Sequence, residues 1–406
     1  MHILFFVDNF YPETNAPATR TLEHAKTWVK SGHQVTVITC FPNFPTGKIF
    51  TGYRNHFRKT EMIDGIKVIR IWTYITANKG FFKRILDYLS YGVHAAIQGL
   101  FVNKPDIIIG SSPQPFAAFA ARFVAIIKCK PFVFEVRDLW PESIGAVTDL
   151  SKSKLMALFS TIIKRLYCKA HLIVCVTDSS KQILSQEGVN PNKIIVIKNG
   201  IDFDSIPQLI PKASIVKQFN LPKDKILIGY VGTIGMAHSI HTIVEAAQIA
   251  DKRFHFVIMG EGAEKQHIAN LIHTHELHNV SLLVGQDRQT ALSLLNALDI
   301  AIIHLRKTPL FQTVIPSKLS EAMALGKPIL LGVDGEARKI LQEAQAGLYF
   351  EPENSTALYE ALILFYDKPS SGYSASIAQR YLHHQFNRTE LAKVYLNHLK
   401  KLTHEL

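Results

Sequence analysis

The sequence predicts an α/β protein of two successive domains, each a doubly wound parallel sheet, facing each other across a deep cleft. Short apolar runs rich in β-branched and aromatic residues alternate with helical patterns, as expected of parallel strands covered by helices on both faces. The pattern stops after Asn199-Gly200, a turn dipeptide followed by a polar stretch, and then restarts. A chain of 406 residues is long enough for two such domains.

The first series of elements occupies the N-terminal half. Each expected strand is a short apolar run, and each expected helix has apolar residues at helical spacing. Strands are expected at 3–7, 35–39, 67–72, 106–110, 132–136, 172–177 and 194–197, and helices at 18–31, 81–102, 115–128, 153–170 and 179–186.

The second series predicts strands at 226–231, 254–259, 280–284, 300–304, 328–331 and 348–350, and a basic helical segment over 374–406. We therefore expect an N-terminal domain over 1–198, a C-terminal domain over 199–385, and a helix over 386–406 that crosses back to the first domain. Ligands of open α/β sheets bind at the carboxyl ends of the strands. The loops after strands are the places to look for chemistry.

Composition narrows the classes of partner. The chain has 45 Lys and Arg against 33 Asp and Glu, a net charge of +12, which favours phosphate-bearing partners or an anionic membrane surface.

Its four cysteines form no CxxC pair, so we expect buried, reduced thiols in a cytoplasmic protein, with neither disulfides nor a metal site. The N-terminus reads as a strand rather than a signal peptide. The cysteines are Cys40, Cys129, Cys168 and Cys175.

The segment 78–104 differs from an ordinary covering helix. It opens with Phe81 and Phe82 beside Lys83 and Arg84 and continues with large apolar residues. A basic, aromatic flank of this kind suits an amphipathic helix in the interface of an anionic leaflet. A helix packed on its own sheet is the alternative, and different faces can serve both roles.

Two glycine-containing loops follow strands of the second series. Residues 232–235 carry Gly232, Thr233 and Gly235, and residues 260–262 are Gly260-Glu261-Gly262. Glycines let the backbone approach a ligand, and amides near a helix N-terminus bind anions. A tight strand-to-helix turn is the simpler explanation for either loop taken alone.

The segment 316–328 carries the clearest signal for a ligand. Ser317 or a residue near it is placed to cap a helix, and Lys318 in the first turn opposes the helix dipole unless an anion is bound there. Glu321 lies on the same face and can accept hydrogen bonds from a ribose diol. The alternative is an exposed Lys–Glu pair of little energetic value.

The run 316–328, with Lys198-Asn199-Gly200-Ile201-Asp202 and 137–143, resembles the retaining glycosyltransferases of family 4, which have the GT-B fold. The likeness is greatest to their N-acetyl-L-fucosamine transferase branch, used in O-antigen and capsule synthesis. It covers nearly the whole chain, since 11–13, 32–37 and 105–109 match the opening domain.

The resemblance implies transfer of an N-acetylated amino sugar from a nucleoside diphosphate, expected to be UDP, to a polyprenyl-diphosphate-linked saccharide. It implies no essential metal or other cofactor and a peripheral position on the inner face of the cytoplasmic membrane. By position, Glu321 matches the second Glu of the family's Glu-x7-Glu motif and is expected to hold the ribose. The first Glu falls on Thr313, which can offer only a hydroxyl to the sugar.

The chain departs from the family where the diphosphate binds. The family's Arg and Lys of the loop after the first C-terminal strand are replaced by Thr233 and His238, and neither is a permanent cation. The groups left to meet the diphosphate charge are the amides of 232–235, Lys318, and Arg306 or Lys307. Of these groups, Lys318 is the best candidate for binding the diphosphate.

On the acceptor side, Asp138 follows a strand and is placed to orient an acceptor hydroxyl or to help its deprotonation. Arg137 stands where many members have His; it is expected to bind acceptor phosphate or to support Asp138, and a purely structural Arg–Asp contact competes. Because the family's retaining transfer is assisted by the leaving phosphate, no nucleophile is assigned. Further expected acceptor contacts are Trp140 and Glu142 nearby, and Glu13, Asn15 and Ala16 in the first loop.

Other functions remain as alternatives. The same fold can act as a UDP-sugar epimerase, and the missing cations are compatible with a non-catalytic subunit that binds nucleotide sugars. A dinucleotide dehydrogenase is disfavoured because no GxGxxG follows any strand. Nucleic acid is not an expected partner, because the basic residues are dispersed.

Overall fold

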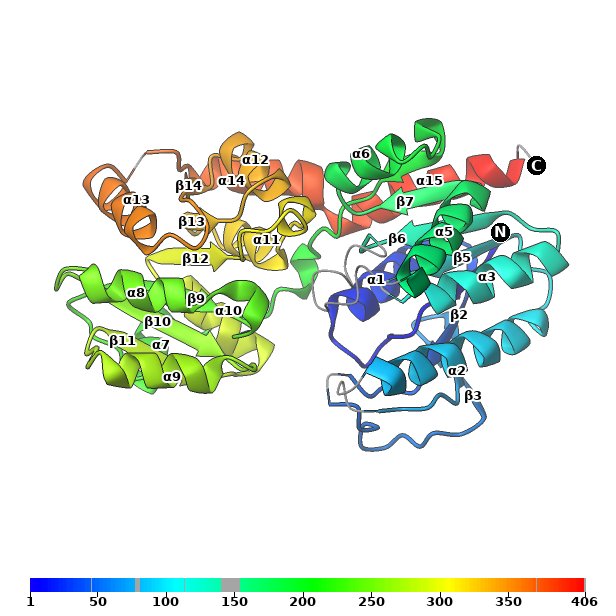
Figure 1. Cartoon of the computed structure of the whole chain (residues 1–406), viewed down its shortest axis with the longest axis horizontal. Coiled ribbons are helices and arrows are strands. Elements are labelled where there is room, and N and C mark those ends of the chain that lie inside the picture. Colours follow the sequence, from blue (N-terminus) through cyan, green and yellow to red (C-terminus); the bar gives the residue numbers. More distant parts are fainter. Residues whose placement is uncertain (45, 77–80, 113, 140–153, 370, 405–406) are drawn as a thin grey trace. The chain divides into compact units, whose positions relative to one another are not determined.

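The computed structural model describes residues 1–44, 46–76, 81–112, 114–139, 154–369 and 371–404. The chain forms two compact units, Met1–Asn199 with Arg388–Leu406, and Gly200–Asn387; we call them the N-terminal and the C-terminal unit (Figure 1). The chain crosses between them after Asn199 and after Asn387. These crossings lie within two residues of the expected boundaries at 198 and 385.

The N-terminal unit is built on an eight-stranded sheet with the order β3-β4-β2-β1-β5-β6-β7-β8. All neighbouring strands are parallel except β3, which is antiparallel to β4. The winding reverses between β1 and β5, so the loops after these strands diverge there and leave room for a ligand. The strands are β1 (His2–Phe6), β2 (Gln34–Cys40), β3 (Arg58–Ile63), β4 (Ile66–Ile71), β5 (Ile107–Ser111), β6 (Phe132–Val136), β7 (Leu172–Cys175) and β8 (Ile194–Val196).

Helices cover both faces of this sheet. One apolar core lies between the sheet and α1 and α15, and a second lies between the sheet and α2, α3 and α5. Because both faces are covered, the inner strands are continuous apolar runs, which is why the sequence predicted them. The helices of this unit are α1 (Ala16–Lys30), α2 (Phe81–Leu100), α3 (Pro115–Ile127), α5 (Lys154–Lys169), α6 (Asp178–Gln186) and α15 (Arg388–His404).

The edge strand β3 was not predicted. Its sequence, RKTEMI, is mostly polar, and most of its side chains are exposed. The local signal was the Asp64-Gly65 turn, in which both residues have positive φ, 50° and 79°; this pair is typical of a tight hairpin. Charged residues on an edge strand also discourage pairing with another chain.

The C-terminal unit has a six-stranded parallel sheet with the order β11-β10-β9-β12-β13-β14. Its winding reverses between β9 and β12, so the loops after these strands also diverge. Three strands, β9, β11 and β12, have the predicted bounds, and the others shift by one residue. The strands are β9 (Ile226–Val231), β10 (Phe254–Gly260), β11 (Val280–Val284), β12 (Ile300–His304), β13 (Ile329–Gly332) and β14 (Gly347–Tyr349).

Two further cores separate this sheet from its helices. Helices α8, α9 and α13 cover one face, and α7, α10, α11, α12 and α14 cover the other. The doubly wound α/β architecture predicted for each domain is therefore confirmed. The helices are α7 (Lys212–Gln218), α8 (His241–Ile249), α9 (Lys265–Thr274), α10 (Arg288–Ala297), α11 (Ser317–Ala324), α12 (Glu336–Glu343), α13 (Ser355–Asp367) and α14 (Ala375–Phe386).

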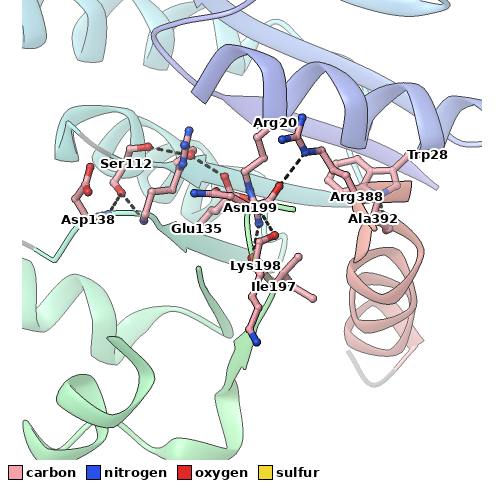
Figure 2. A network of polar contacts seen from close by, with 12 residues as sticks. Arg20, Trp28, Ser112, Glu135, Asp138, Ile197, Lys198, Asn199, Arg388 and Ala392 are labelled. Carbon is pink, nitrogen blue, oxygen red and sulfur yellow. Dashed lines mark hydrogen bonds and ion pairs between the residues drawn. The ribbon is translucent and has the colours of Figure 1, made fainter. Parts of the chain in front are cut away.

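The first crossing segment is anchored in the N-terminal unit by Arg20 of α1 (Figure 2). Its guanidinium donates to the carbonyl oxygens of Lys198 (2.7 Å) and Ile197 (3.0 Å) and pairs with Glu135 of β6, with 3.4 Å between Nε and Oε2. Arg20 and Glu135 are each 1% exposed. Arg20 thus joins α1, the end of β6 and the chain that leaves the unit.

The second crossing segment returns at Arg388, which donates from Nε to the carbonyl oxygen of Asn199 (2.8 Å) and pairs with Glu23 of α1. Helix α15 is then held against α1 by Trp28, whose indole N–H donates to the carbonyl oxygen of Ala392 (2.9 Å; Figure 2). The segment predicted as one helix is interrupted at the extended residue before Arg388, so α14 and α15 belong to different units.

The prediction that the cysteines are buried is half wrong. Cys40 and Cys175 are buried, but Cys129 and Cys168 are exposed, and all four are free thiols. Cys129 lies in the turn after α3 with φ of 50°, and Cys168 lies on the outer side of α5. Apolar neighbours in sequence do not bury a residue that a helix turns toward solvent.

Candidate active site

Lys318 of α11 lies against the loop that follows β9. Pro316, next to Ser317, occupies the N-cap position of the helix, and its side chain makes no capping hydrogen bond. The Lys318 ammonium lies 4.8 Å from the centroid of the Tyr230 ring. A Cβ on Gly232 would lie 2.0 Å from Lys318 Cε, so the lysine can cross this position only because the residue there is glycine.

Burial lowers the pKa of Lys318 to about 8, while the negative charge of Glu321 acts in the opposite direction. Glu321 follows one turn later on α11, as the sequence predicted. Desolvation disfavours the charged amine, and an arriving anion would restore it. This corner of the unit therefore suits an anionic ligand.

The loops after β9 and β10 approach each other closely through their backbones at Gly260 and Gly262. A Cβ on Gly260 would lie 1.7 Å from the carbonyl oxygen of Gly232, and one on Gly262 would lie 2.1 Å from that of Ile234. Gly232 and Gly262 also have positive φ, +149° and +157°. The predicted glycines are thus required for the close approach of the two loops.

The same packing corrects one expectation about anion binding. The amides of Gly232 and Ile234 donate to carbonyl oxygens at the end of β10, at 2.8 Å each. They are therefore not available to a phosphate, although 232–235 had been expected to offer its amides. Within the described contacts of this loop, the amides of Thr233 and Gly235 donate to no backbone carbonyl.

Two of the other predicted donor-site residues hydrogen-bond within the unit. The carboxylate of Glu261 accepts from Lys265 Nζ (2.7 Å) and from the amide of Gly285 (3.0 Å), and these contacts lower its pKa, with the Lys265 bond contributing most. The Thr313 hydroxyl donates to the carbonyl oxygen of Leu310 (2.8 Å). A hydroxyl so engaged can still accept a bond from a sugar.

Arg306 and Lys307 follow β12, and both are paired with glutamates. Arg306 Nε lies 3.6 Å from Glu353 Oε1, and Lys307 Nζ lies 2.5 Å from Glu351 Oε1. About half of each basic side chain is exposed. Their charges are already matched, which leaves Lys318 as the stronger candidate for a diphosphate.

In the N-terminal unit, Ser112 organises the predicted acceptor residues (Figure 2). Its hydroxyl oxygen accepts from the amides of Arg137 (2.7 Å) and Asp138 (3.3 Å), and its own amide donates to the carbonyl oxygen of Glu135 (2.9 Å). Ser112 follows β5, next to β6 in the sheet. Ser112 was not predicted from the sequence, although a polar residue directly after a buried strand was a usable signal.

Arg137 has two buried donor atoms that find no partner among the described residues. Its Nε and Nη1 atoms make no hydrogen bond within the described structure. Burial lowers the pKa of Arg137 to about 10, while the charge of Glu135 opposes this most strongly, followed by those of Asp138 and Asp8. Burial also raises the pKa of Asp138, and Arg137 opposes it. Orphaned guanidinium donors beside carboxylates suit a polar, partly anionic ligand.

Asp8 is a further candidate site residue that was not predicted from the sequence. It follows β1, and burial, reinforced by the charge of Glu13, raises its pKa to about 6. Asp87 of α2 has a pKa of about 7, raised by burial and then by the charge of Asp8. The carboxyl ends of β1 and β6 therefore bring together Asp8 and Arg137, which no local pattern joins.

In the loop between β1 and α1, the predicted acceptor residues Glu13 and Asn15 make hydrogen bonds within the N-terminal unit. Glu13 is buried, and its carboxylate accepts from the amides of Asn43 (2.7 Å) and Phe44 (2.8 Å). Asn15 caps α1 by accepting from a backbone amide in the first turn, and Ala16 begins that helix as an exposed residue. Trp140 and Glu142 lie outside the described residues.

Two family profiles match the chain. The profile described as "Glycosyltransferase Family 4" matches residues 18–205, and the profile described as "Glycosyl transferases group 1" matches residues 211–380. The chain is also similar to a protein of Escherichia coli (strain K12) with the provisional name colanic acid biosynthesis glycosyl transferase WcaI. The two are 25% identical over 337 residues, which are 80% of this chain and 82% of that protein.

Solved structures share the fold. Anabaena HepE, crystallised with UDP and glucose, has a TM-score of 0.72 at 15% identity over 99% of this chain and 100% of that one. Sucrose-phosphate synthase from Thermosynechococcus elongatus has a TM-score of 0.76 at 17% identity, covering 100% of both chains. The chain therefore carries two adjoining glycosyltransferase regions, a family 4 region followed by a group 1 region, and shares the GT-B fold of these solved structures.

Proposed function

We propose that the protein transfers a sugar, with retention of anomeric configuration, from a UDP-sugar to a polyprenyl-diphosphate-linked saccharide during synthesis of a surface polysaccharide. The donor sugar is proposed to be an N-acetylated amino sugar, as in the branch that the sequence resembles. A role in polysaccharide synthesis is supported by the similarity to the Escherichia coli protein, whose provisional name refers to colanic acid biosynthesis. UDP as the donor nucleotide is supported by the similar structure of HepE, which was crystallised with UDP.

One observation carries the donor assignment. A half-buried Lys318 lies across Gly232 and the Tyr230 ring, with Glu321 on the same helix face. An ammonium beside a glycine loop is suited to the diphosphate, and a carboxylate one turn away is suited to the ribose hydroxyls. In this proposal the lysine stabilises the charge of the departing diphosphate, and no metal is needed.

The reaction proceeds on one face of the donor sugar. The bond between the anomeric carbon and the diphosphate oxygen breaks as the acceptor oxygen bonds to that carbon, and the acceptor proton passes to the departing phosphate oxygen. Asp138 orients the acceptor hydroxyl, and the unpaired donors of Arg137 bind a phosphate of the acceptor. No protein nucleophile is required.

Thermal unfolding with UDP, GDP or ADP, with and without Mg²⁺, tests the donor site. We expect UDP alone to stabilise the protein, by about 2.7 kcal/mol at a concentration of 100 times Kd, whether or not Mg²⁺ is present. Glu321→Ala should lose this effect, and Glu245→Ala, which replaces an exposed glutamate of α8, should retain it. Equal stabilisation by all three nucleotides would contradict the assignment to UDP.

A non-catalytic role is the second candidate, because Thr233 and His238 stand where the family that the sequence resembles is expected to carry permanent cations. UDP binding without turnover, against a panel of UDP-sugars and polyprenyl-diphosphate saccharides, would favour it. Release of UDP from a UDP-sugar without any acceptor would instead favour an epimerase.

The membrane part of the proposal depends on α2. None of the described helices is long and apolar enough to cross a bilayer. One face of α2 and the turn after it nevertheless carries apolar side chains that are 41% to 74% exposed, while Tyr91 and Ala95 on the other face are buried. Lys83 and Arg84 at its start are exposed and basic. The stripe, at spacings of three and four residues, consists of Leu86, Leu89, Val93, Ile97 and Phe101.

We propose that this stripe lies in the interface of an anionic leaflet on the cytoplasmic side of the membrane. Exposed apolar residues near the end of the adjacent α3, such as Phe123 and Ile126, would add to the contact. Co-sedimentation with vesicles containing phosphatidylglycerol should be strong for the wild type and weak with phosphatidylcholine alone.

The double variant Leu86→Glu/Leu89→Glu should lose vesicle binding while UDP binding is kept. Val394→Glu is the matched control, because Val394 of α15 is 46% exposed and Leu89 is 45% exposed. Equal sedimentation of both variants would show that the stripe is not the membrane contact.

A further inference from the structure

His238 shares an aromatic support with Lys318. It ends the short 3-10 helix Met236–His238 after β9, and its ring stands edge-on to Tyr230 with 6.0 Å between centroids. The Lys318 ammonium lies over the same ring at 4.8 Å. The Tyr230 hydroxyl donates to the carbonyl oxygen of Thr233 (2.7 Å), so one buried ring joins the loop, the imidazole and the lysine.

The backbone of His238 is held from both sides. Its amide donates to the carbonyl oxygen of Gly235 (2.9 Å), and its carbonyl oxygen accepts from Nδ1 of the buried His304 (2.8 Å). The other ring nitrogen of His304 accepts from the amide of Glu353 (2.9 Å). Because these partners require a proton on Nδ1 and none on Nε2, His304 is a neutral positioning residue.

The His238 side chain has spare hydrogen-bonding capacity. Its Nδ1 is buried and makes no hydrogen bond within the described structure. A buried polar atom without a partner is unfavourable, so a ligand that contributes a hydrogen-bond partner would stabilise this position. The groups that face the ring are Lys318 of α11, His304 of β12, the Gly235 carbonyl and the Tyr230 ring.

We propose that His238 is a conditional cation of the donor site: it is neutral in the empty protein and takes up a proton from solvent when the donor diphosphate binds beside Lys318. Binding of the nucleotide sugar is thereby coupled to proton uptake. This inference rests on the proposed function and names the group that replaces the permanent cation missing from the loop.

The electrostatics around His238 agree with this proposal. Burial, followed by the positive charge of Lys318, lowers the pKa of His238 to about 4, and only the Gly235 carbonyl among the facing groups acts clearly in the opposite direction. A diphosphate next to both side chains would offset their mutual repulsion and favour the imidazolium. If a full proton is taken up, affinity falls about tenfold for each unit of increasing pH between the free and bound pKa values.

Calorimetric titration of the full chain with UDP-glucose tests the coupling. Its diphosphate is esterified at both ends and does not titrate near neutral pH, so any proton uptake belongs to the protein. At pH 6.5 Lys318, with a pKa of about 8, is already protonated. Comparing binding heats in two buffers with different ionisation enthalpies should show uptake of about half a proton or more by the wild type.

Two variants isolate the imidazole. His238→Gln should bind UDP-glucose about tenfold more weakly at pH 6.5 without taking up a proton, since it loses a charge-assisted hydrogen bond. His238→Lys, which places a lysine at this position, should bind at pH 6.5 without proton uptake. Between pH 5.5 and 6.5, where Lys318 stays protonated, its affinity should change less with pH than that of the wild type. If His238→Gln does not fold, comparing proton uptake by the wild type and by His238→Lys still shows whether His238 takes up the proton.

The outcomes separate the two levels of the argument. Equal proton uptake by the wild type and either variant, with binding intact, would overturn the role of His238 and leave the proposed function standing. If the wild type binds neither UDP-glucose nor UDP, the proposed UDP-sugar donor is wrong, and this inference fails with it.

Discussion

Gly260 and Gly235 belong to neighbouring loops of the C-terminal unit but differ in the space around them. A Cβ at Gly260 would lie 1.7 Å from the carbonyl oxygen of Gly232, whereas one at Gly235 would meet nothing nearer than 3.6 Å. The loop after β9, which contacts Lys318 through Gly232, can therefore pack on the end of β10 only if residue 260 lacks a side chain.

Gly260→Ala should push the two loops apart and lower the free energy of unfolding by about 1–3 kcal/mol. UDP affinity should fall with it, because Gly232 would no longer lie beneath Lys318. Gly235→Ala, as the matched control, should stay within about 0.5 kcal/mol of the wild type. Urea unfolding and UDP titration of both variants check this, and equal stability of the two would contradict it.

Asp87 illustrates how one buried charge affects the pH dependence of stability. Its pKa is raised to about 7 by burial and by Asp8, above the value of the unfolded chain. The folded state therefore holds the proton more tightly, and stability is lost as pH rises toward and through about 7.

Asp87→Asn should consequently raise the melting temperature at pH 8, by roughly 2–4 °C for each kcal/mol regained, and leave it nearly unchanged at pH 4. Asp224→Asn, at an exposed aspartate of the C-terminal unit, should change neither value. Melting curves at the two pH values measure the difference. An effect of Asp87→Asn that is the same at both would point to packing instead of charge.

At the scale of elements, α1 is the part that joins the two crossing segments. Arg20 binds the first crossing segment and Glu135, and Trp28 holds α15 after the second. Since β6 leads from Glu135 directly to Arg137 and Asp138, the candidate acceptor residues share a framework with the crossing segments.

Arg20→Met should be costly because it leaves Glu135 buried without its cation. Loss of one partner of a buried pair typically destabilises by about 3–5 kcal/mol. Lys393→Met removes an ion pair whose side chains are 52% and 60% exposed, and should cost at most about 1 kcal/mol. Denaturant unfolding compares them, and a cost below 1 kcal/mol for Arg20→Met would show that the pair is not a structural support.

At the scale of the whole molecule, each unit has its own pair of cores, and the described core clusters contain residues of one unit only. Units with separate cores can unfold separately. A ligand that binds one of them stabilises that one.

UDP should therefore slow amide hydrogen exchange in the C-terminal unit, most strongly in the loop after β9 and in the first turn of α11. Exchange in α1 and at the end of β1 should change little. Exchange followed by mass spectrometry, with and without UDP, provides the measurement. Protection confined to the N-terminal unit would contradict the proposal that UDP binds the C-terminal unit.

The sequence by itself determined the alternation of strands and helices, the division into two units and the identity of the loops that follow strands. These depend on local apolar periodicity, which is strongest in strands buried on both faces; the polar edge strand β3 was missed for the same reason. It also indicated Lys318 and Glu321, since both lie in one short segment.

Only the tertiary structure decided which groups meet. Lys318 lies over Gly232, and the charge of Asp8 acts on Arg137, although the members of each pair are far apart in the chain. The fold of the loop after β9 likewise brings the His238 ring onto Tyr230. It likewise showed that Glu13, Asn15 and two of the loop amides have partners within the protein. The physical reason is that burial, desolvation and unpaired hydrogen-bonding groups are properties of a packed neighbourhood, which residue order alone does not specify.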